Sequence, residues 1–321
     1  MKKLISGLHH VTALAADAQK NLDFYAGILG LRMVKKTVNF DAPDIYHLYY
    51  GDELGTPGTI ITFFPIRSLS PGRKGMGQLT VTSFSIPSGS IDYWINRFDK
   101  FKVEHKRPQE RFGNEVFIYF EDYEGLGLEL VANSNDLRSG YTQGVIPEHF
   151  AIKGFYGVTL NVDIPESTAA FLTGQLDFVF LKEQGSRTRY ASPGISANFV
   201  DILRSPDNIK GLAGSGTIHH VALAVADDRE QREMRQRLID SGISVTPVID
   251  RDYFHSIYFR EPGGVLFEVA TSDIGFTRDE DREKLGEKLK LPHWVESERI
   301  RIESQLEAIQ LDDEKFRIDA Q

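Results

Sequence analysis

The sequence predicts an α+β fold in which four βαβββ modules form two half-closed, barrel-like cavities and a helical tail follows. The first observation is a repeat: residues 7–15 (GLHHVTALA) return almost unchanged within residues 216–225 (GTIHHVALAV). Such a repeat indicates an internal duplication. The second observation is that a helical pattern and three short extended runs follow each of these strands. The same order of elements can be traced four times along the chain.

The first half of the chain supplies two modules. In the first, Asp17 is placed to cap a helix and Gly30 to end it. The first module is predicted to contain a strand at 7–15, a helix at 18–29 and strands at 31–38, 45–50 and 59–64. The second is predicted to contain a strand at 79–86, a helix at 88–98 and strands at 103–106, 115–120 and 126–131.

The second half repeats the arrangement after a hydrophilic connection at 133–153. The third module covers 154–203, with its helix at 167–176. The fourth starts at Gly216, and either Asp227 or Asp228 caps its helix. Its predicted elements are that helix at 229–241, which Gly242 ends, and strands at 243–249, 254–259 and 265–270.

The last part of the chain has a different character. Residues 278–288 are charged and predicted to be helical, Pro292 interrupts, and 295–309 form an amphipathic helix. We expect this tail to pack on the surface or on a second subunit, which would make the protein a homo-oligomer. The expected domains are 1–140, with the first two modules, 153–275, with the other two, and the tail at 276–321.

Composition excludes several classes of function. The net charge of -9 and a pI near 5.5 offer no basic surface for nucleic acid or anionic membranes. There is no run of 18 apolar residues, and the first residues do not resemble a signal peptide, so a cytoplasmic location is expected. Because the chain has no cysteine, a metal would have to be bound by His, Asp or Glu.

Equivalent positions in the four modules suggest where a metal could bind. The first-strand position of His10 holds Thr80, Gly157 and His220 in the other modules, in that order. The last-strand position of Glu268 holds Thr62 or Phe63, Glu129 and Asp201 in modules one to three. If modules one and four pair, His10, His220 and Glu268 converge. Two imidazoles and one carboxylate with open positions suit Fe(II) in an oxygen-activating enzyme, and Mn(II) could replace it.

The same comparison gives a different expectation for the other cavity. Modules two and three would contribute Thr80, Glu129, Gly157 and Asp201, a set without histidine that makes a poor transition-metal site. For any single histidine, a structural role is the alternative to metal binding. The apolar run around Glu268 argues against that role, because a charge in an apolar strand is costly unless it is paired or metal-bound.

Three motifs carry a resemblance to a known family: the Gly-x-His-His-Val-Thr opening, the second His-His-Val-Ala, and Arg-Glu-Pro-Gly-Gly-x-Leu-Phe-Glu-Val-Ala at 260–270. Together they resemble the vicinal oxygen chelate superfamily of glyoxalases, bleomycin resistance proteins and extradiol dioxygenases. Over nearly the whole chain, including the tail at 290–296, the sequence looks like the ring-cleaving hydroquinone dioxygenase branch of that superfamily. This resemblance implies that His10, His220 and Glu268 bind Fe(II).

The resemblance also implies catalytic roles for residues around the metal, which match here as His9, Thr12, His219, Arg251 and Tyr258. Arg251 would offset negative charge that develops on oxygen, and Tyr258 would donate a hydrogen bond to oxygen or substrate. If the strands are regular, His9 and His219 face away from the metal. His255, on the strand face opposite Tyr258, is expected to be structural.

The implied activity is an Fe(II)-dependent dioxygenase that opens the ring of a hydroquinone with O2. A catechol extradiol dioxygenase is an alternative, but those enzymes place a histidine 19 residues before the metal-binding Glu, where this chain has Ile249. A glyoxalase-like isomerase would want a fourth protein ligand, and position 62 offers none. A metal-free protein that sequesters drugs is the rival from another class, and it would not need a convergent His-His-Glu set.

Overall fold

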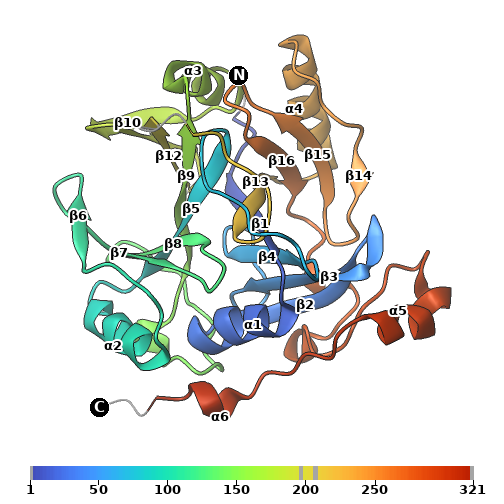
Figure 1. Ribbon diagram of the computed structural model, residues 1–321. Helices are drawn as coiled ribbons and strands as arrows, with labels where there is room; N and C mark the ends of the chain where they lie inside the picture. Colours follow the sequence, from blue (N-terminus) through green and yellow to red (C-terminus); the bar gives the residue numbers. More distant parts are fainter. Residues whose placement is uncertain (1–2, 195–197, 205–208, 319–321) are drawn as a thin grey trace.

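The computed structural model describes residues 3–194, 198–204 and 209–318, and it forms two twisted sheets (Figure 1). The first sheet has the strand order β14-β15-β16-β13-β1-β4-β3-β2. Its strands from module one are β1 (Gly7–Ala15), β2 (Arg32–Asn39), β3 (Ala42–Gly51) and β4 (Ile60–Pro65). Those from module four are β13 (Thr217–Val225), β14 (Ile249–Asp250), β15 (His255–Arg260) and β16 (Leu266–Thr271).

The second sheet has the same arrangement, in the order β10-β11-β12-β9-β5-β8-β7-β6. Module two supplies β5 (Gln78–Ile86), β6 (Gln109–Arg111), β7 (Glu115–Glu121) and β8 (Gly127–Ala132). Module three supplies β9 (Gly154–Val162), β10 (Val179–Gln184), β11 (Arg187–Ala191) and β12 (Phe199–Arg204). Antiparallel pairing of β1 with β13, and of β5 with β9, joins the modules. The predicted α+β fold with two half-barrels is therefore confirmed, with modules one and four in one sheet.

The helices of the first and fourth modules begin and end where the sequence signals them, whereas those of the second and third, predicted at 88–98 and 167–176, are displaced by up to three residues. Asp17 caps α1 (Ala18–Leu22) by accepting from the Lys20 amide, and Asp227 caps α4 (Asp228–Asp240) by accepting from the Glu230 amide. After α1 the chain continues as a π-helical segment, η1 (Asp23–Ile28), and Gly30 ends it with a φ of 68°. The remaining two module helices are α2 (Ile91–Phe101) and α3 (Pro165–Gln175).

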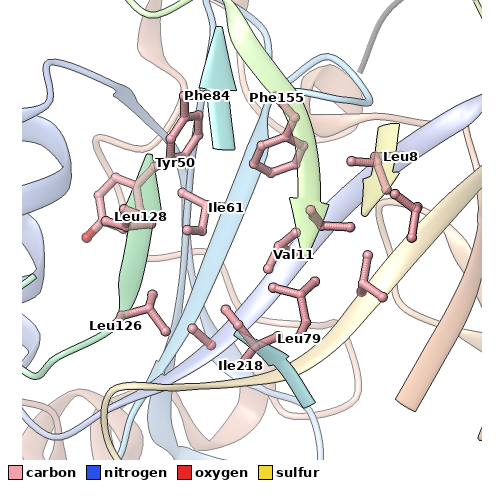
Figure 2. Close-up of a cluster of buried hydrophobic side chains, with 14 of the residues drawn as sticks. Leu8, Val11, Tyr50, Ile61, Leu79, Phe84, Leu126, Leu128, Phe155 and Ile218 are labelled. Carbon is pink, nitrogen blue, oxygen red and sulfur yellow. The ribbon is translucent and has the colours of Figure 1, made fainter. Parts of the chain in front are cut away.

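The main hydrophobic core lies between the two sheets (Figure 2). Leu8 and Val11 of β1 and Ile61 of β4 contribute from the first sheet, and Phe84 of β5 and Phe155 of β9 contribute from the second. Because alternate residues of a strand face opposite sides, the neighbours of these core residues face away from the core. That leaves His10, Thr12 and Thr62 on the concave face of the first sheet.

Two predicted strands are shorter in the structure. The strand expected at 103–106 is reduced to a single bridge between His105 and Phe120, and the edge strand is β6. The strand expected at 243–249 is reduced to β14. Just before it, the Thr246 hydroxyl accepts from the Tyr258 amide in place of a backbone carbonyl, so a side chain ends the ladder.

The tail is less helical than predicted. Residues 278–288 contain only short 3₁₀ turns, and the amphipathic segment forms η5 (Glu296–Glu298) and α5 (Arg299–Gln305) before a last turn, α6 (Asp313–Phe316). Residues 319–321 of the predicted tail lie outside the described residues. The charged segment has no apolar stripe to bury as a helix; instead Asp279 and Glu280 turn inward to the buried ammonium of Lys35 on β2.

The tail packs on module one of the same chain (Figure 1). Val295 and Ile302 form a small cluster with Val38 of β2, and the Phe316 ring lies against Gly27 in η1. Its own chain therefore covers part of the apolar surface of the tail, while Trp294 and Ile300 stay exposed. Within the described ranges, no helix is long and apolar enough to cross a membrane.

Candidate metal centre

The three side chains predicted to bind metal converge on the concave face of the first sheet. His10 projects from β1, His220 from β13 and Glu268 from β16, and all three are buried. Their ligand atoms lie within 4.8 Å of one another. His10 Nε2 lies 3.2 Å from His220 Nε2 and 3.4 Å from Glu268 Oε2, and His220 Nε2 lies 2.9 Å from that same oxygen. These three atoms face one point.

Strand register explains the convergence. In the antiparallel β1–β13 pair, His10 lies opposite Ala222. In the parallel β13–β16 pair, Ala222 lies opposite Glu268. His10 and Glu268 therefore flank Ala222 from its two neighbouring strands, and His220 is on the same face two residues earlier. The register of β1 with β4 also pairs Thr12 with Thr62, which makes Thr62, and not Phe63, the counterpart of Glu268.

A hydrogen-bond chain fixes the tautomer of His10. The Thr271 carbonyl can only accept, so His9 Nε2, at 3.1 Å, donates to it. Burial, reinforced by the neighbouring His10, lowers the pKa of His9 to about 3. A neutral His9 then accepts at Nδ1 from the His10 Nδ1–H, 2.9 Å away. The lone pair of His10 Nε2 is left pointing at the centre, an arrangement typical of a metal-binding histidine.

His9 and His219 occupy irregular positions in their strands, so the regular strands on which the prediction for their direction depended are not present; His219 lines the cavity, whereas His9 lies behind His10. The register of the β1–β13 pair shifts twice, once at each of these residues. Such bulges re-aim side chains. His219 Nδ1 lies 2.7 Å from His220 Nδ1, repeating the His9–His10 contact in module four. The expectation assumed regular strands, and the bulges remove that regularity.

The carboxylate of Glu268 has one satisfied and one unsatisfied oxygen. Ser256 Oγ donates to Oε1, while Oε2 makes no hydrogen bond within the described part of the chain. Burial opposes ionisation of Glu268, so a carboxylate at this place needs positive charge beside it. A buried anionic oxygen facing imidazole nitrogens calls for a cation. The residues present therefore fit a bound metal ion.

A cavity of about 330 Å³ opens in front of the three ligand atoms. Apolar side chains form much of its wall, and a few polar groups reach it from both modules. The apolar residues are Leu14, Phe40, Phe64, Ile66 and Phe254, and the polar residues besides the three ligands are Asn39, Asp41, His47, Tyr49, His219, Arg251 and Tyr258. An apolar pocket with a few placed polar groups is typical of a small-molecule site.

Arg251 and Tyr258 both line the cavity, as predicted for residues near the reacting groups. Arg251 Nε donates to Tyr258 Oη at 3.2 Å, and its other arm lies 3.2 Å from Asp41 Oδ2. The Tyr258 ring packs edge-on against the His220 ring, with centroids 5.7 Å apart. Burial and the nearby Glu268 charge raise the pKa of Tyr258, so its hydroxyl keeps its proton.

The remaining predicted residues have different surroundings. Thr12 Oγ1 lies 3.0 Å from Thr62 Oγ1, behind the cavity wall. His255 Nδ1 contacts Asp228 Oδ1 at 2.5 Å, which ties β15 to the start of α4. Sequence reasoning missed His47 and Tyr49 on β3. The sequence carried no signal for them, because the register that places Tyr49 opposite Thr62, as Tyr258 lies opposite Glu268, is visible only in the structure.

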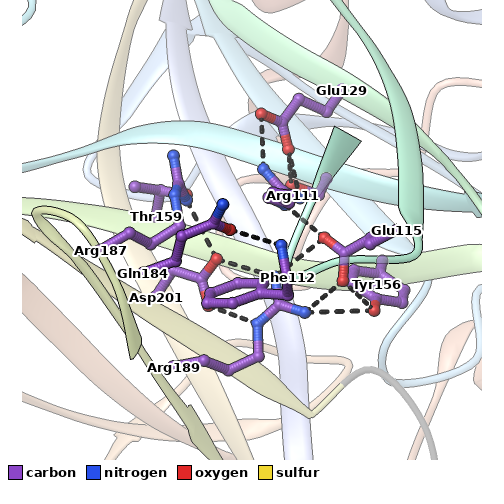
Figure 3. Close-up of polar contacts among 11 residues, drawn as sticks. Arg111, Phe112, Glu115, Glu129, Tyr156, Thr159, Gln184, Arg187, Arg189 and Asp201 are labelled. Atoms are coloured by element: carbon purple, nitrogen blue, oxygen red, sulfur yellow. Dashed lines mark hydrogen bonds and ion pairs between the residues drawn. The ribbon is translucent and has the colours of Figure 1, made fainter. Parts of the chain in front are cut away.

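The equivalent place in the second sheet is occupied by arginine side chains (Figure 3). Glu129 and Asp201 stand where Glu268 stands in the first sheet, as predicted. Arg189 donates to Asp201 and Glu115, and Arg111 donates to Glu115 and Glu129. Guanidinium groups therefore neutralise these carboxylates.

One predicted equivalence in the second sheet is wrong by one residue. Val81 lies opposite Thr159 as His10 lies opposite Ala222, so Val81 and not Thr80 corresponds to His10. A register shift between Leu79 and Val81 accounts for the error. Bulges cannot be seen in the alternation of apolar residues from which the positions were matched.

Comparison with known proteins agrees with this geometry. The family model described as "Glyoxalase/Bleomycin resistance protein/Dioxygenase superfamily" matches residues 7–130 and 149–269. The chain belongs to this superfamily. Each matched segment covers two βαβββ modules, so the superfamily pattern occurs twice in the chain.

Curated relatives match over almost the whole chain. A Bacillus subtilis protein named "Putative ring-cleaving dioxygenase MhqO" is 44% identical over 306 residues, covering 95% of this chain and 97% of its own. The "Chlorohydroquinone/hydroquinone 1,2-dioxygenase" of Sphingobium indicum is 34% identical over 301 residues, covering 91% of this chain and 93% of its own. These names support an oxidoreductase of the dioxygenase class.

Solved structures give the same fold. A Bacillus subtilis crystal structure described as a "putative dioxygenase" superposes with a TM-score of 0.93 at 43% identity, covering 97% of this chain and all of that one. Glyoxalase I from Zea mays superposes with a TM-score of 0.60 at 12% identity, covering 83% of this chain and 92% of that one. The second likeness shows a shared fold alone.

Proposed function

We propose that this protein is an Fe(II)-dependent, ring-cleaving dioxygenase that acts on hydroquinone-type aromatics with O2. The observation that supports it most directly is the convergence of His10, His220 and Glu268 at the base of a largely apolar cavity. The names of the relatives, one of them a hydroquinone 1,2-dioxygenase, point to the same reaction class.

The donor set favours Fe(II). Two neutral imidazole nitrogens and one carboxylate leave open positions, which is the pattern of oxygen-activating iron enzymes. Mn(II) accepts the same donors and is the alternative metal. When bound, the metal would supply Lewis-acid stabilisation of a substrate oxygen and activation of O2.

The residues around the ligands have proposed roles that follow from their contacts. His9 and His219 hold His10 and His220 through their Nδ1 atoms, which orients the ligand nitrogens. Arg251 donates to the Tyr258 hydroxyl, so that hydroxyl can donate its own hydrogen into the cavity. The permanently cationic Arg251 also offsets negative charge that develops there.

Thr12 acts indirectly in this proposal, through Thr62. Its hydroxyl contacts Thr62, the residue that replaces a fourth ligand in module one. Because the Thr62 hydroxyl is also bonded to His47 Nε2 at 2.8 Å, it is occupied on both sides. A glyoxalase-like isomerase that needs a fourth protein ligand is therefore less well supported than the dioxygenase.

Oxygen uptake tests the proposal. The protein, purified without oxygen and loaded with Fe(II), is offered methylhydroquinone and catechol in parallel, with His220→Ala as the control. We expect uptake with methylhydroquinone only, and none in the variant. Uptake with catechol only would contradict the substrate class. Stoichiometric iron without uptake on either substrate would favour the isomerase or the binding protein.

A further inference from the structure

Tyr49 and Tyr258 are counterparts that the internal duplication places on either side of the metal centre. Tyr258 on β15 pairs with Glu268, and Tyr49 on β3 pairs with Thr62, the counterpart of Glu268. Both tyrosines line the cavity. Along the sheet the three ligands lie on β16, β13 and β1, with β15 beyond one end and β3 beyond the other. The two hydroxyl groups therefore approach a bound ring from different sides.

A continuous hydrogen-bond chain ends at Tyr49. Thr12 Oγ1 lies 3.0 Å from Thr62 Oγ1, Thr62 Oγ1 lies 2.8 Å from His47 Nε2, and His47 Nδ1 lies 2.8 Å from Tyr49 Oη. With a neutral imidazole these four side chains carry four polar hydrogens for three contacts. One hydrogen is left over, and it is either at the Tyr49 end or on one of the fully buried hydroxyls of Thr12 and Thr62.

The two ends differ in what surrounds them. Thr12 is fully buried, does not line the cavity and makes no other side-chain hydrogen bond among the described residues. A spare hydrogen there would be an unsatisfied buried donor, which is costly. With the opposite direction, each group donates toward Tyr49, and the spare hydrogen is on the Tyr49 oxygen at the cavity wall. That direction satisfies every buried donor once a ligand oxygen is present.

The Tyr49 ring is held in place. It packs at 5.1 Å from the Phe276 ring and at 4.0 Å from the His47 ring, which itself stacks at 4.2 Å on Phe64. Burial raises the pKa of Tyr49 well above its ordinary value, with the neighbouring Tyr258 and Glu268 adding to the shift. The hydroxyl therefore keeps its hydrogen, and it is a fixed donor awaiting an acceptor.

We propose that Tyr49 binds the second oxygen of the aromatic substrate, the hydroxyl para to the oxygen that faces His10, His220 and Glu268. This inference rests on the proposed function and names the group that selects its substrate class. Tyr49 on β3 is separated from His10 on β1 by β4, so the Tyr49 hydroxyl reaches the cavity from a strand that carries none of His10, His220 and Glu268.

Equilibrium binding of hydroquinone and phenol to the Fe(II)-loaded protein without oxygen tests the inference. The two ligands differ only in the para hydroxyl. We expect wild-type protein to bind hydroquinone about tenfold more tightly than phenol, as one buried hydrogen bond allows. Tyr49→Phe removes one oxygen atom and should reduce the preference to less than about twofold.

Tyr50→Phe is the matched control. It makes the same change one residue along β3, at a buried hydroxyl that has no hydrogen-bond partner among the described residues and faces the core between the sheets (Figure 2). It should keep the wild-type preference. A Tyr49→Phe protein that still prefers hydroquinone, or a wild-type protein without preference, would overturn the inference. Because the readout is binding, it is independent of whether the ring is cleaved, so oxygen uptake tests the proposed function separately.

Discussion

At the scale of single residues, the His-His pairs explain why the repeated motif contains two histidines and not one. The second histidine of each pair points at the centre, and the first holds it through Nδ1. In module one the hydrogen bond from His9 to the Thr271 carbonyl fixes the His9–His10 pair to the backbone of β16, the strand that carries Glu268. The same strand therefore supplies a ligand and fixes the orientation of another.

Replacing His9 should weaken metal binding without removing a ligand. In His9→Phe the Nδ1–H of His10 loses its acceptor, so we expect metal affinity to fall by about 10- to 100-fold. Competition with a chelator of known affinity measures the change. His255→Gln is the control, because His255 contacts Asp228 away from the ligands. Equal affinities in wild-type and His9→Phe proteins would contradict the role given to His9.

The buried neutral histidines also make a prediction about pH. Burial lowers the folded-state pKa of His9 to about 3, whereas an unfolded histidine has a pKa near 6.5. Above pH 6.5 both states are neutral. As the pH falls from 6.5 toward 3, only the unfolded chain binds the proton, so His9 lowers the free energy of unfolding by about 1.4 kcal/mol per pH unit.

Urea unfolding of the metal-free protein, measured from about pH 6 to about pH 4, tests this dependence. Both pH values lie between the folded-state and unfolded-state pKa of His9. In His9→Gln the residue at position 9 cannot titrate. The free energy of unfolding of this variant should therefore fall less steeply with decreasing pH than that of the wild type, by about 1.4 kcal/mol per pH unit. Parallel curves for the two proteins would show that His9 is not held neutral by the fold.

The convergence of His10, His220 and Glu268 could be predicted from the sequence, but their surroundings could not. His10 and His220 were marked by the repeat, and Glu268 by its apolar strand. The contacts of His9 and His219 depend on bulges, and the role of Tyr49 depends on the register of β3 with β4. Neither a bulge nor a strand register is visible in the alternation of apolar residues.

At the scale of elements, the tail stabilises β2 through a buried charge. The Lys35 ammonium is fully buried and contacts Asp279 Oδ1 at 2.6 Å and the Glu280 carboxylate. Its position also explains why the charged segment is not a long helix: two of its acidic side chains must reach one point on β2. The sequence showed the charge of this segment but not its partner in module one.

Removing both acidic partners should destabilise the protein strongly. The double variant Asp279→Ala with Glu280→Ala leaves a buried ammonium without a carboxylate, which costs about 3–5 kcal/mol. Chemical denaturation measures the loss. Asp281→Ala is the matched control, since its carboxylate is exposed and lies 3.9 Å from Lys284. A change below about 1 kcal/mol in the double variant would show that the tail does not hold β2.

At the scale of the whole molecule, one framework is used twice with different side chains around its carboxylates. The first sheet gathers two histidines and a glutamate, and the second gathers carboxylates around Arg111 and Arg189 (Figure 3). The module order could be predicted, because the repeated strand motif marks it, whereas the pairing of modules one and four was only a condition that the structure meets. The arginines could not be predicted, because β6 and β11, which carry Arg111 and Arg189, had no clear sequence pattern.

The second sheet should therefore serve stability and not metal binding. Arg189→Met leaves Glu115 and Asp201 partly uncompensated and should cost about 3–5 kcal/mol of stability. Metal affinity at His10, His220 and Glu268 should not change. Denaturation and metal titration measure both quantities, with Arg204→Met, at an exposed ion pair with Glu166, as the control. Loss of metal binding in folded Arg189→Met protein would contradict this division of roles.

Two expectations about the whole chain stay predictions. We propose the domain limits 1–140, 153–275 and 276–321, and limited proteolysis at the connections tests them. We also propose a homo-oligomer. The tail, which suggested it, is partly covered by its own chain, but the edge strand β10 exposes Val179, Phe180 and Leu181 side by side. A monomer in light scattering would contradict that proposal.

The most direct test of the central claim is the fate of oxygen atoms. The Fe(II)-loaded protein is given hydroquinone under ¹⁸O2, and the product is analysed by mass spectrometry. A ring-cleaving dioxygenase predicts an open-chain product that contains both ¹⁸O atoms, and the Glu268→Gln variant should form none. An unlabelled product, or a quinone formed without ring opening, would contradict the assignment of dioxygenase chemistry to His10, His220 and Glu268.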